Sequence, residues 1–135
     1  MEQRLNEGPD KVRNQSTSQV NDEIDLQTRD NILWYSREEP GVIAARMAHL
    51  DKEWDMERML ILHSSMLSLV GIMMGTAKSR LWYFLPAVLT CLLAQHAILG
   101  WNPLMIAFRK KGIRTRKEID MEKYALMDAL KSKQA

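Results

Sequence analysis

Between Leu81 and Trp101 the chain runs for 21 residues without an Asp, Glu, Lys or Arg. A helix rises about 1.5 Å per residue, so roughly 20 apolar residues span the roughly 30 Å hydrocarbon core of a bilayer. Trp82 stands at one end and Trp101 at the other, where aromatic rings favour the boundary with the lipid headgroups. Residues 81–101 therefore predict a transmembrane helix.

The preceding segment, residues 59–75, also lacks acidic and strongly basic residues, but it is shorter and more polar. A polar turn at residues 76–80 joins the two segments, and together they predict a membrane hairpin. The alternative is a soluble helical hairpin. That alternative requires a polar face, and Thr90, Gln95 and His96 form no continuous stripe in the second segment.

The polar sequence before the hairpin predicts three segments. Residues 1–20 are rich in polar groups and predict a disordered tail, and residues 21–35 allow a short helix capped by Asn21. A capping-box pattern at Ser36–Glu39 then opens residues 36–58, which carry an apolar stripe of Ile43, Met47, Leu50 and Trp54. Because no helix breaker follows, we expect one cytosolic amphipathic helix that continues into the first span.

Two helices are predicted after the hairpin. Asn102 and Pro103 form a typical helix start for a short interfacial helix at residues 103–111. A second capping box, from Thr115 to Glu118, opens an amphipathic helix at residues 115–131. The predicted fold class is all-α: a two-span transmembrane helical hairpin with a long N-terminal amphipathic helical extension and short C-terminal helices.

Small residues at helical spacing predict close helix packing within the membrane. The first span offers Ser64, Ser68, Gly71 and Gly75, and the second offers Ala87, Cys91 and Ala94. Small side chains let two backbones approach closely where lipid gives no hydrophobic drive for association. The faces either pack against each other within one hairpin or join two copies in a homodimer, and the sequence leaves both open.

A basic patch follows the second span. Its members are Arg109, Lys110, Lys111, Arg114, Arg116 and Lys117, against Lys78 and Arg80 in the turn. Since Lys and Arg near the ends of spans mark the cytoplasmic side, we expect both termini to be cytoplasmic, with some affinity of the patch for anionic lipid. Without interleaved aromatic residues or a known binding fold, the patch does not indicate nucleic-acid binding.

The residues from Gln95 to Leu104, followed by Arg109-Lys-Lys-Gly112 and Arg114 to Asp120, resemble the YgaP-like transmembrane domain family. The similarity covers roughly residues 51–130. It implies a small two-span protein of the bacterial inner membrane, with unassigned function. Asn102 stands where the family usually has a cysteine, so the resemblance does not carry any thiol chemistry to this chain.

The chemistry-bearing residues are few, and we identify no catalytic constellation, resident metal or cofactor. An antiparallel hairpin places His63 and His96 at similar depth, where they either ligate a haem or metal or form hydrogen bonds between helices. Cys91 is expected to be a packing residue. The favoured function is a helical membrane anchor or interaction module that self-associates and recruits a cytosolic protein; the alternatives are a haem- or metal-binding redox subunit and a small transporter component.

Overall fold

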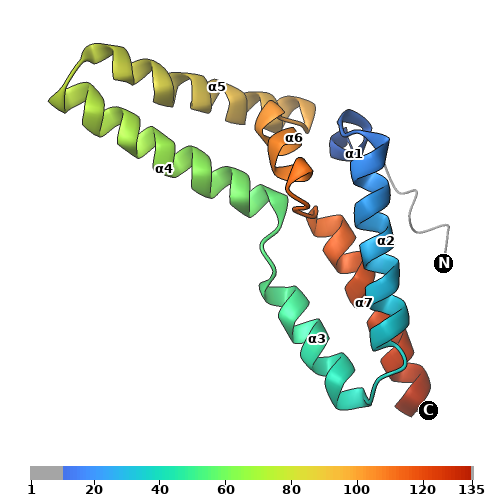
Figure 1. Ribbon diagram of the computed structural model, residues 1–135. Helices are drawn as coiled ribbons and strands as arrows, with labels where there is room; N and C mark the ends of the chain where they lie inside the picture. Colours follow the sequence, from blue (N-terminus) through green and yellow to red (C-terminus); the bar gives the residue numbers. More distant parts are fainter. Residues whose placement is uncertain (1–10, 135) are drawn as a thin grey trace.

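A computed structural model describes residues 11–134, which are helical without any strand. The all-α fold and the helical hairpin are confirmed. In Figure 1 the hairpin projects to one side of a group of helices that contains both ends of the described chain. The elements are α1 (Lys11–Gln15), α2 (Ser18–Tyr35), α3 (Pro40–Lys52), α4 (Met56–Ala77), the 3-10 helix η2 (Arg80–Tyr83), α5 (Phe84–Leu99), α6 (Pro103–Lys110) and α7 (Arg116–Gln134).

The hairpin consists of α4 and α5, which lie side by side along their length (Figure 1). Two helical stretches, ending at Ala77 and Leu99, are long and apolar enough to cross a membrane. The turn between the two helices includes η2, where the Ser79 hydroxyl caps the first residues. At its other end α5 stops at Gly100, whose φ of 75° lies in the left-handed region that glycine adopts without strain.

We call α2, α3 and α7 the helical head. α7 packs against both of the other helices, and its core with α3 is a fully buried cluster of Ile43, Leu50, Ile119 and Leu126. A second cluster joins the hairpin to the rest of the chain and contains Val12, Met56, Leu60 and Met105. The head and the hairpin therefore have separate apolar cores, and α1 and α6 lie between them (Figure 1).

The prediction of one helix running from residue 36 into the first span is wrong. α3 ends at Lys52, and Glu53 adopts extended backbone with φ −62° and ψ 137°. The Asp55 carboxylate then caps α4 by accepting a hydrogen bond of 2.9 Å from the Arg58 amide. Side-chain caps of this kind stabilise a helix start, so Asp55 begins a new helix where the periodicity suggested continuity.

Other predicted boundaries on the N-terminal side also change. Ser36 closes α2 instead of opening α3, which begins at Pro40 after an extended Glu39. Asn21 is not a cap, since α2 already starts at Ser18. The predicted disorder is wrong for α1 and the first turn of α2, and residues 1–10 lie outside the described part. The helices predicted at 21–35, 103–111 and 115–131 are present, with ends shifted by a few residues.

Candidate functional site

The structure divides the predicted basic patch into three pairs with different surroundings. Arg109 and Arg114 are buried in ion pairs, so the predicted affinity of the patch for anionic lipid does not extend to them. Lys110 and Lys111 are exposed at the C-terminal end of α6. Arg116 and Lys117 open α7 and line a groove beside the end of α5. The buried pair is therefore taken up by the fold.

Glu118 is the centre of the first buried ion-pair cluster. Both of its carboxylate oxygens accept from the guanidinium of Arg109, which is 0% exposed. Arg13 of α1 donates to the same carboxylate at 2.6 Å and binds Asp25 of α2 at 2.7 and 2.9 Å. The Asn21 amide oxygen accepts from Arg109 at 3.0 Å. The cluster thus joins α1, α2, α6 and α7 through charge-assisted hydrogen bonds, which are the stronger class.

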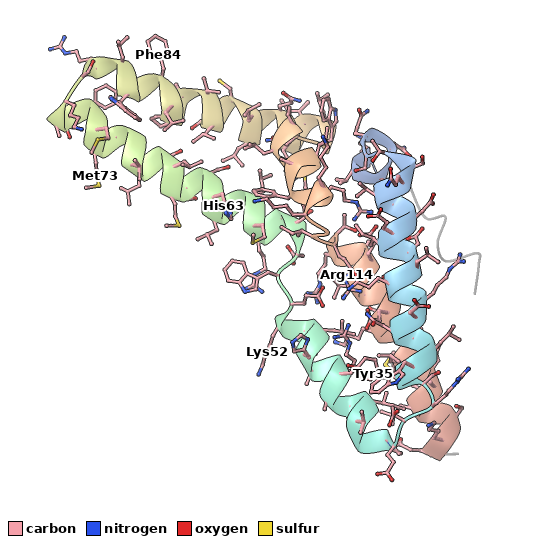
Figure 2. All side chains as sticks on the ribbon, viewed as in Figure 1. Tyr35, Lys52, His63, Met73, Phe84 and Arg114 are labelled. Atoms are coloured by element: carbon pink, nitrogen blue, oxygen red, sulfur yellow. The ribbon has the colours of Figure 1, made fainter. Side chains whose placement is uncertain are left out.

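Glu122, one turn further along α7, is the centre of the second cluster. It is fully buried and accepts from Arg46 of α3 at 2.8 Å and from Arg114. Arg114 also binds Glu53 with two parallel hydrogen bonds of 2.9 and 2.7 Å. Glu53 lies in the break between α3 and α4, and Figure 2 shows Arg114 where the hairpin meets the head. This cluster therefore holds the break in place.

The pKa values of the charged groups reflect this arrangement. Burial raises the pKa of Glu118, but hydrogen bonds from Arg109 and the Thr115 amide outweigh burial, so its pKa lies below the ordinary value. Burial lowers the pKa of Arg114, but Glu53 and Glu122 reverse that and raise it. Hydrogen bonding to Asp25 is the main reason that the pKa of Arg13 is raised. These three groups are held in their charged forms.

The local sequence explains how α7 presents both glutamates. Thr115 and Glu118 form the predicted capping box: the Thr115 amide donates to Glu118 at 2.9 Å, and the Glu118 amide donates to the Thr115 hydroxyl at 3.4 Å. Glu122 follows four residues later on the same helix face. The capping box is visible in the sequence, but its pairing with Arg109 depends on how α6 and α7 are placed relative to each other, which the sequence does not show.

The small residues of the first span lie on the side of α4 that faces the inside of the hairpin. Ser64, Gly71 and Gly75 are buried, while Ser68 is half-buried. A Cβ atom at Gly71 would lie 2.6 Å from Cδ of Pro86, and one at Gly75 would lie 2.8 Å from the Tyr83 ring. This contact supports the alternative in which the glycine face packs within one chain.

The small residues of the second span lie on a side of α5 that does not face α4. Ala87, Cys91 and Ala94 are exposed, so they do not pack against the glycine face of α4. Leu85, Pro86 and Leu89 are instead the more buried positions of α5. The α5 face of Ala87, Cys91 and Ala94 is therefore exposed in the described structure.

The two histidines of the spans have different neighbours. Nδ1 of His63 lies 2.8 Å from the Met59 carbonyl oxygen of its own helix, and its ring packs on Phe108 of α6. His96 is half-buried and lines the groove near α1, and its Nδ1 has no hydrogen-bond partner among the described residues. Within residues 11–134, no group of three or more His, Cys, Asp or Glu residues is arranged to hold a metal ion.

No protein-family model, curated protein or solved structure matches this chain.

The geometry of the two ion-pair clusters shows how they link the parts of the chain. α6 follows directly from α5 and carries Arg109, whereas Glu53 directly precedes α4 and binds Arg114. Both helices of the hairpin are therefore linked to α7 through an arginine, and the two clusters couple the hairpin to the head.

Proposed function

We propose that this chain is a membrane-anchored interaction module, in which α4 and α5 insert into a bilayer and the helical head projects on one side. The proposal rests on the apolar surface that the hairpin exposes on its outward face. Large apolar side chains are exposed along its length, including Phe84 at 68% and Ile98 at 78%. In Figure 2 Met73 and Phe84 point away from the hairpin. Soluble monomers rarely expose such continuous apolar surface, whereas lipid would cover it.

The distribution of positive charge supports a cytoplasmic head. Exposed Lys110 and Lys111, with Arg116 and Lys117, flank the end of the hairpin that joins the head, whereas the opposite turn carries Lys78 and Arg80. The excess of Lys and Arg favours the head side as cytoplasmic. Placement in the bacterial inner membrane rests on the resemblance to the YgaP-like transmembrane domain family.

Cysteine labelling in inner-membrane preparations tests insertion and orientation together. Cys91 is the only native cysteine, so Cys91→Ser gives a background for Ser79→Cys in the turn and Ser132→Cys in α7. In intact spheroplasts an impermeant maleimide should label the turn variant alone, and in inverted vesicles the α7 variant alone. Labelling of both variants from one side, or release of the protein by alkaline carbonate, would refute the topology.

Self-association is the second part of the proposal. The α5 face of Ala87, Cys91 and Ala94 is exposed and has small side chains, which suits close approach of another helix. If two copies meet there, mild oxidation of membranes should link Cys91 to Cys91 in a covalent dimer. A Cys91→Ser variant with Thr90→Cys, one position around the helix, is the matched control and should link less. Equal yields would show random collision.

The head is the part proposed to recruit a cytosolic protein. Leu26 and Leu33 lie two turns apart on α2 and are 58% and 57% exposed, on a helix whose opposite face carries Thr28 and Ile24 into the head. Exposed apolar residues that share a face mark interaction surfaces more often than isolated ones do. Crosslinking at Leu33 with a photoreactive amino acid in cells searches directly for such a partner, and Gln27, which is exposed on another side of α2, is the control position.

A further inference from the structure

The break between α3 and α4 lies where the hairpin joins the head (Figure 1), and it exposes a large aromatic side chain. Trp54 follows Glu53, at which α3 has ended, and precedes Asp55, which caps α4. Trp54 is 48% exposed, although Ile43 and Leu50 of the same predicted apolar stripe are fully buried. The extended backbone of the break ends the helical periodicity, so Trp54 does not continue the buried face of α3.

The backbone on both sides of Trp54 is held in place. Glu53 accepts hydrogen bonds of 2.9 and 2.7 Å from Arg114, and the Met56 amide donates to the Arg114 carbonyl oxygen at 3.1 Å. Neither of the two apolar clusters described above includes Trp54. Its ring is therefore presented from a fixed position on the surface, and it fills no core.

Arg58 determines the level of this ring relative to a bilayer. Residues 59–77 contain no Asp, Glu, Lys or Arg, and at about 1.5 Å per residue they extend about 28 Å, close to the roughly 30 Å of a hydrocarbon core. Arg58 is exposed and directly precedes this stretch, so its charge lies in the headgroup layer on the side of the head when the hairpin is inserted. Its guanidinium carbon lies 4.8 Å from the centroid of the Trp54 ring, which places the ring at the same level.

We propose that Trp54 and Arg58 together bind the lipid headgroup layer of the bilayer. The inference rests on the proposed insertion of the hairpin. Indole rings favour this layer because they are apolar with one polar N–H, and a guanidinium there pairs with lipid phosphate. Lipid is favoured over a protein partner because the next turns of α4 expose Ile61 and Leu62, at 60% and 39%, which belong to the surface proposed to contact acyl chains. The loop that meets the lipid is then the one that Arg114 ties to the head.

Fluorescence of single-tryptophan variants of the full chain in phospholipid vesicles tests the contact. The chain has four tryptophans, so replacing three of them by Phe leaves one reporter. Trp34 is the matched control, because it is 56% exposed and precedes Tyr35, which Figure 2 shows in the head well away from the hairpin.

The two exposed fractions, 48% for Trp54 and 56% for Trp34, predict nearly equal quenching by aqueous acrylamide if lipid covers neither ring. With Trp54 in the headgroup layer, acrylamide should quench Trp54 much less than Trp34. Bromine atoms on the acyl chain close to the headgroup should quench Trp54 more strongly than bromine atoms near the end of the chain, and neither should quench Trp34.

Trp82, in the turn of the hairpin, reports insertion separately when it is the single tryptophan. Quenching of Trp82 but not of Trp54 by brominated lipid would overturn the headgroup contact and leave the membrane anchor standing. Absence of quenching at Trp82 would refute the anchor itself, and the contact with it. Equal quenching of Trp54 and Trp34 by acrylamide would also overturn the contact. If circular dichroism shows that a variant with three substitutions is unfolded, the same comparison is made with Trp101 retained in both chains, since Trp101 adds an equal signal to each.

Discussion

Replacing Glu118 by Gln tests whether the buried charges hold the head to the hairpin. The substitution keeps the shape of the side chain and removes the charge that compensates Arg109. Arg109 is 0% exposed, and its remaining acceptors are neutral: the Asn21 amide oxygen and the new glutamine oxygen. Removing one partner of a buried ion pair destabilises by about 3–5 kcal/mol, because the other charge is left buried without compensation.

The lower end of that range applies to Glu118→Gln. Glutamine can still accept one hydrogen bond, and Arg13 keeps its two hydrogen bonds to Asp25. A loss of about 3 kcal/mol corresponds to a fall in melting temperature of roughly 6–12 °C for a chain of this size. Thermal unfolding of the full chain in mild detergent, followed by far-UV circular dichroism, measures that fall.

Two comparison variants identify the cause. Glu23→Gln makes the same chemical change at an exposed position of α2 and should shift the melting temperature by less than about 2 °C. Arg109→Met with Glu118→Leu removes both charges and should melt above Glu118→Gln, since an apolar pair leaves no uncompensated charge. Two outcomes would show that the charges do not stabilise this junction. One is a melting temperature of Glu118→Gln equal to that of Glu23→Gln, and the other is a double variant with the lowest melting temperature of all.

Three further predictions follow from single contacts. The free energy of unfolding should fall as the pH drops below 4.5, the ordinary pKa of glutamate, because Glu118 has a lowered pKa in the folded chain and its contribution is lost on protonation; Glu118→Gln should flatten this dependence in acid titrations. Gly71→Leu should destabilise the hairpin, and Gly41→Leu should not, in melting experiments, because a Cβ atom meets Pro86 at the first site and nothing within 4 Å at the second. Asn102→Ala should lower the melting temperature by about 3–8 °C, since about 1–2 kcal/mol follows from losing the cap on Leu104 and the hydrogen bond to the Leu92 carbonyl.

The hairpin could be predicted from the sequence because its signal is local. A run without charged residues is a property of neighbouring positions, and the caps at Asn102 and Thr115 are formed by residues two or three positions apart. Each of these features depends on the backbone nearby and needs no knowledge of the fold. The same reasoning located the helices predicted at residues 21–35, 103–111 and 115–131 within a few residues.

The errors come from side-chain contacts between different elements of the fold. The break at Glu53 is stabilised by Arg114, 61 positions later, so helical periodicity alone favoured continuity. Arg109 and Arg114 are indistinguishable in sequence from Lys110 and Lys111, yet the first two are buried and the others are exposed. Their difference depends on Glu118 and Glu122, which a count of positive residues near a span does not consider.

Arginine suits the positions of this network better than lysine does. The guanidinium offers five donors in a planar fork, so Arg109 serves Glu118 and Asn21 together, and Arg114 serves Glu53, Glu122 and Thr28. A lysine could satisfy one of these carboxylates but could not join three chain segments in a fixed geometry. The exposed positions next to them hold lysines, which need no such geometry. Within this patch, arginine at the junction therefore acts as a structural link, and Lys110 and Lys111 are charges exposed on the surface.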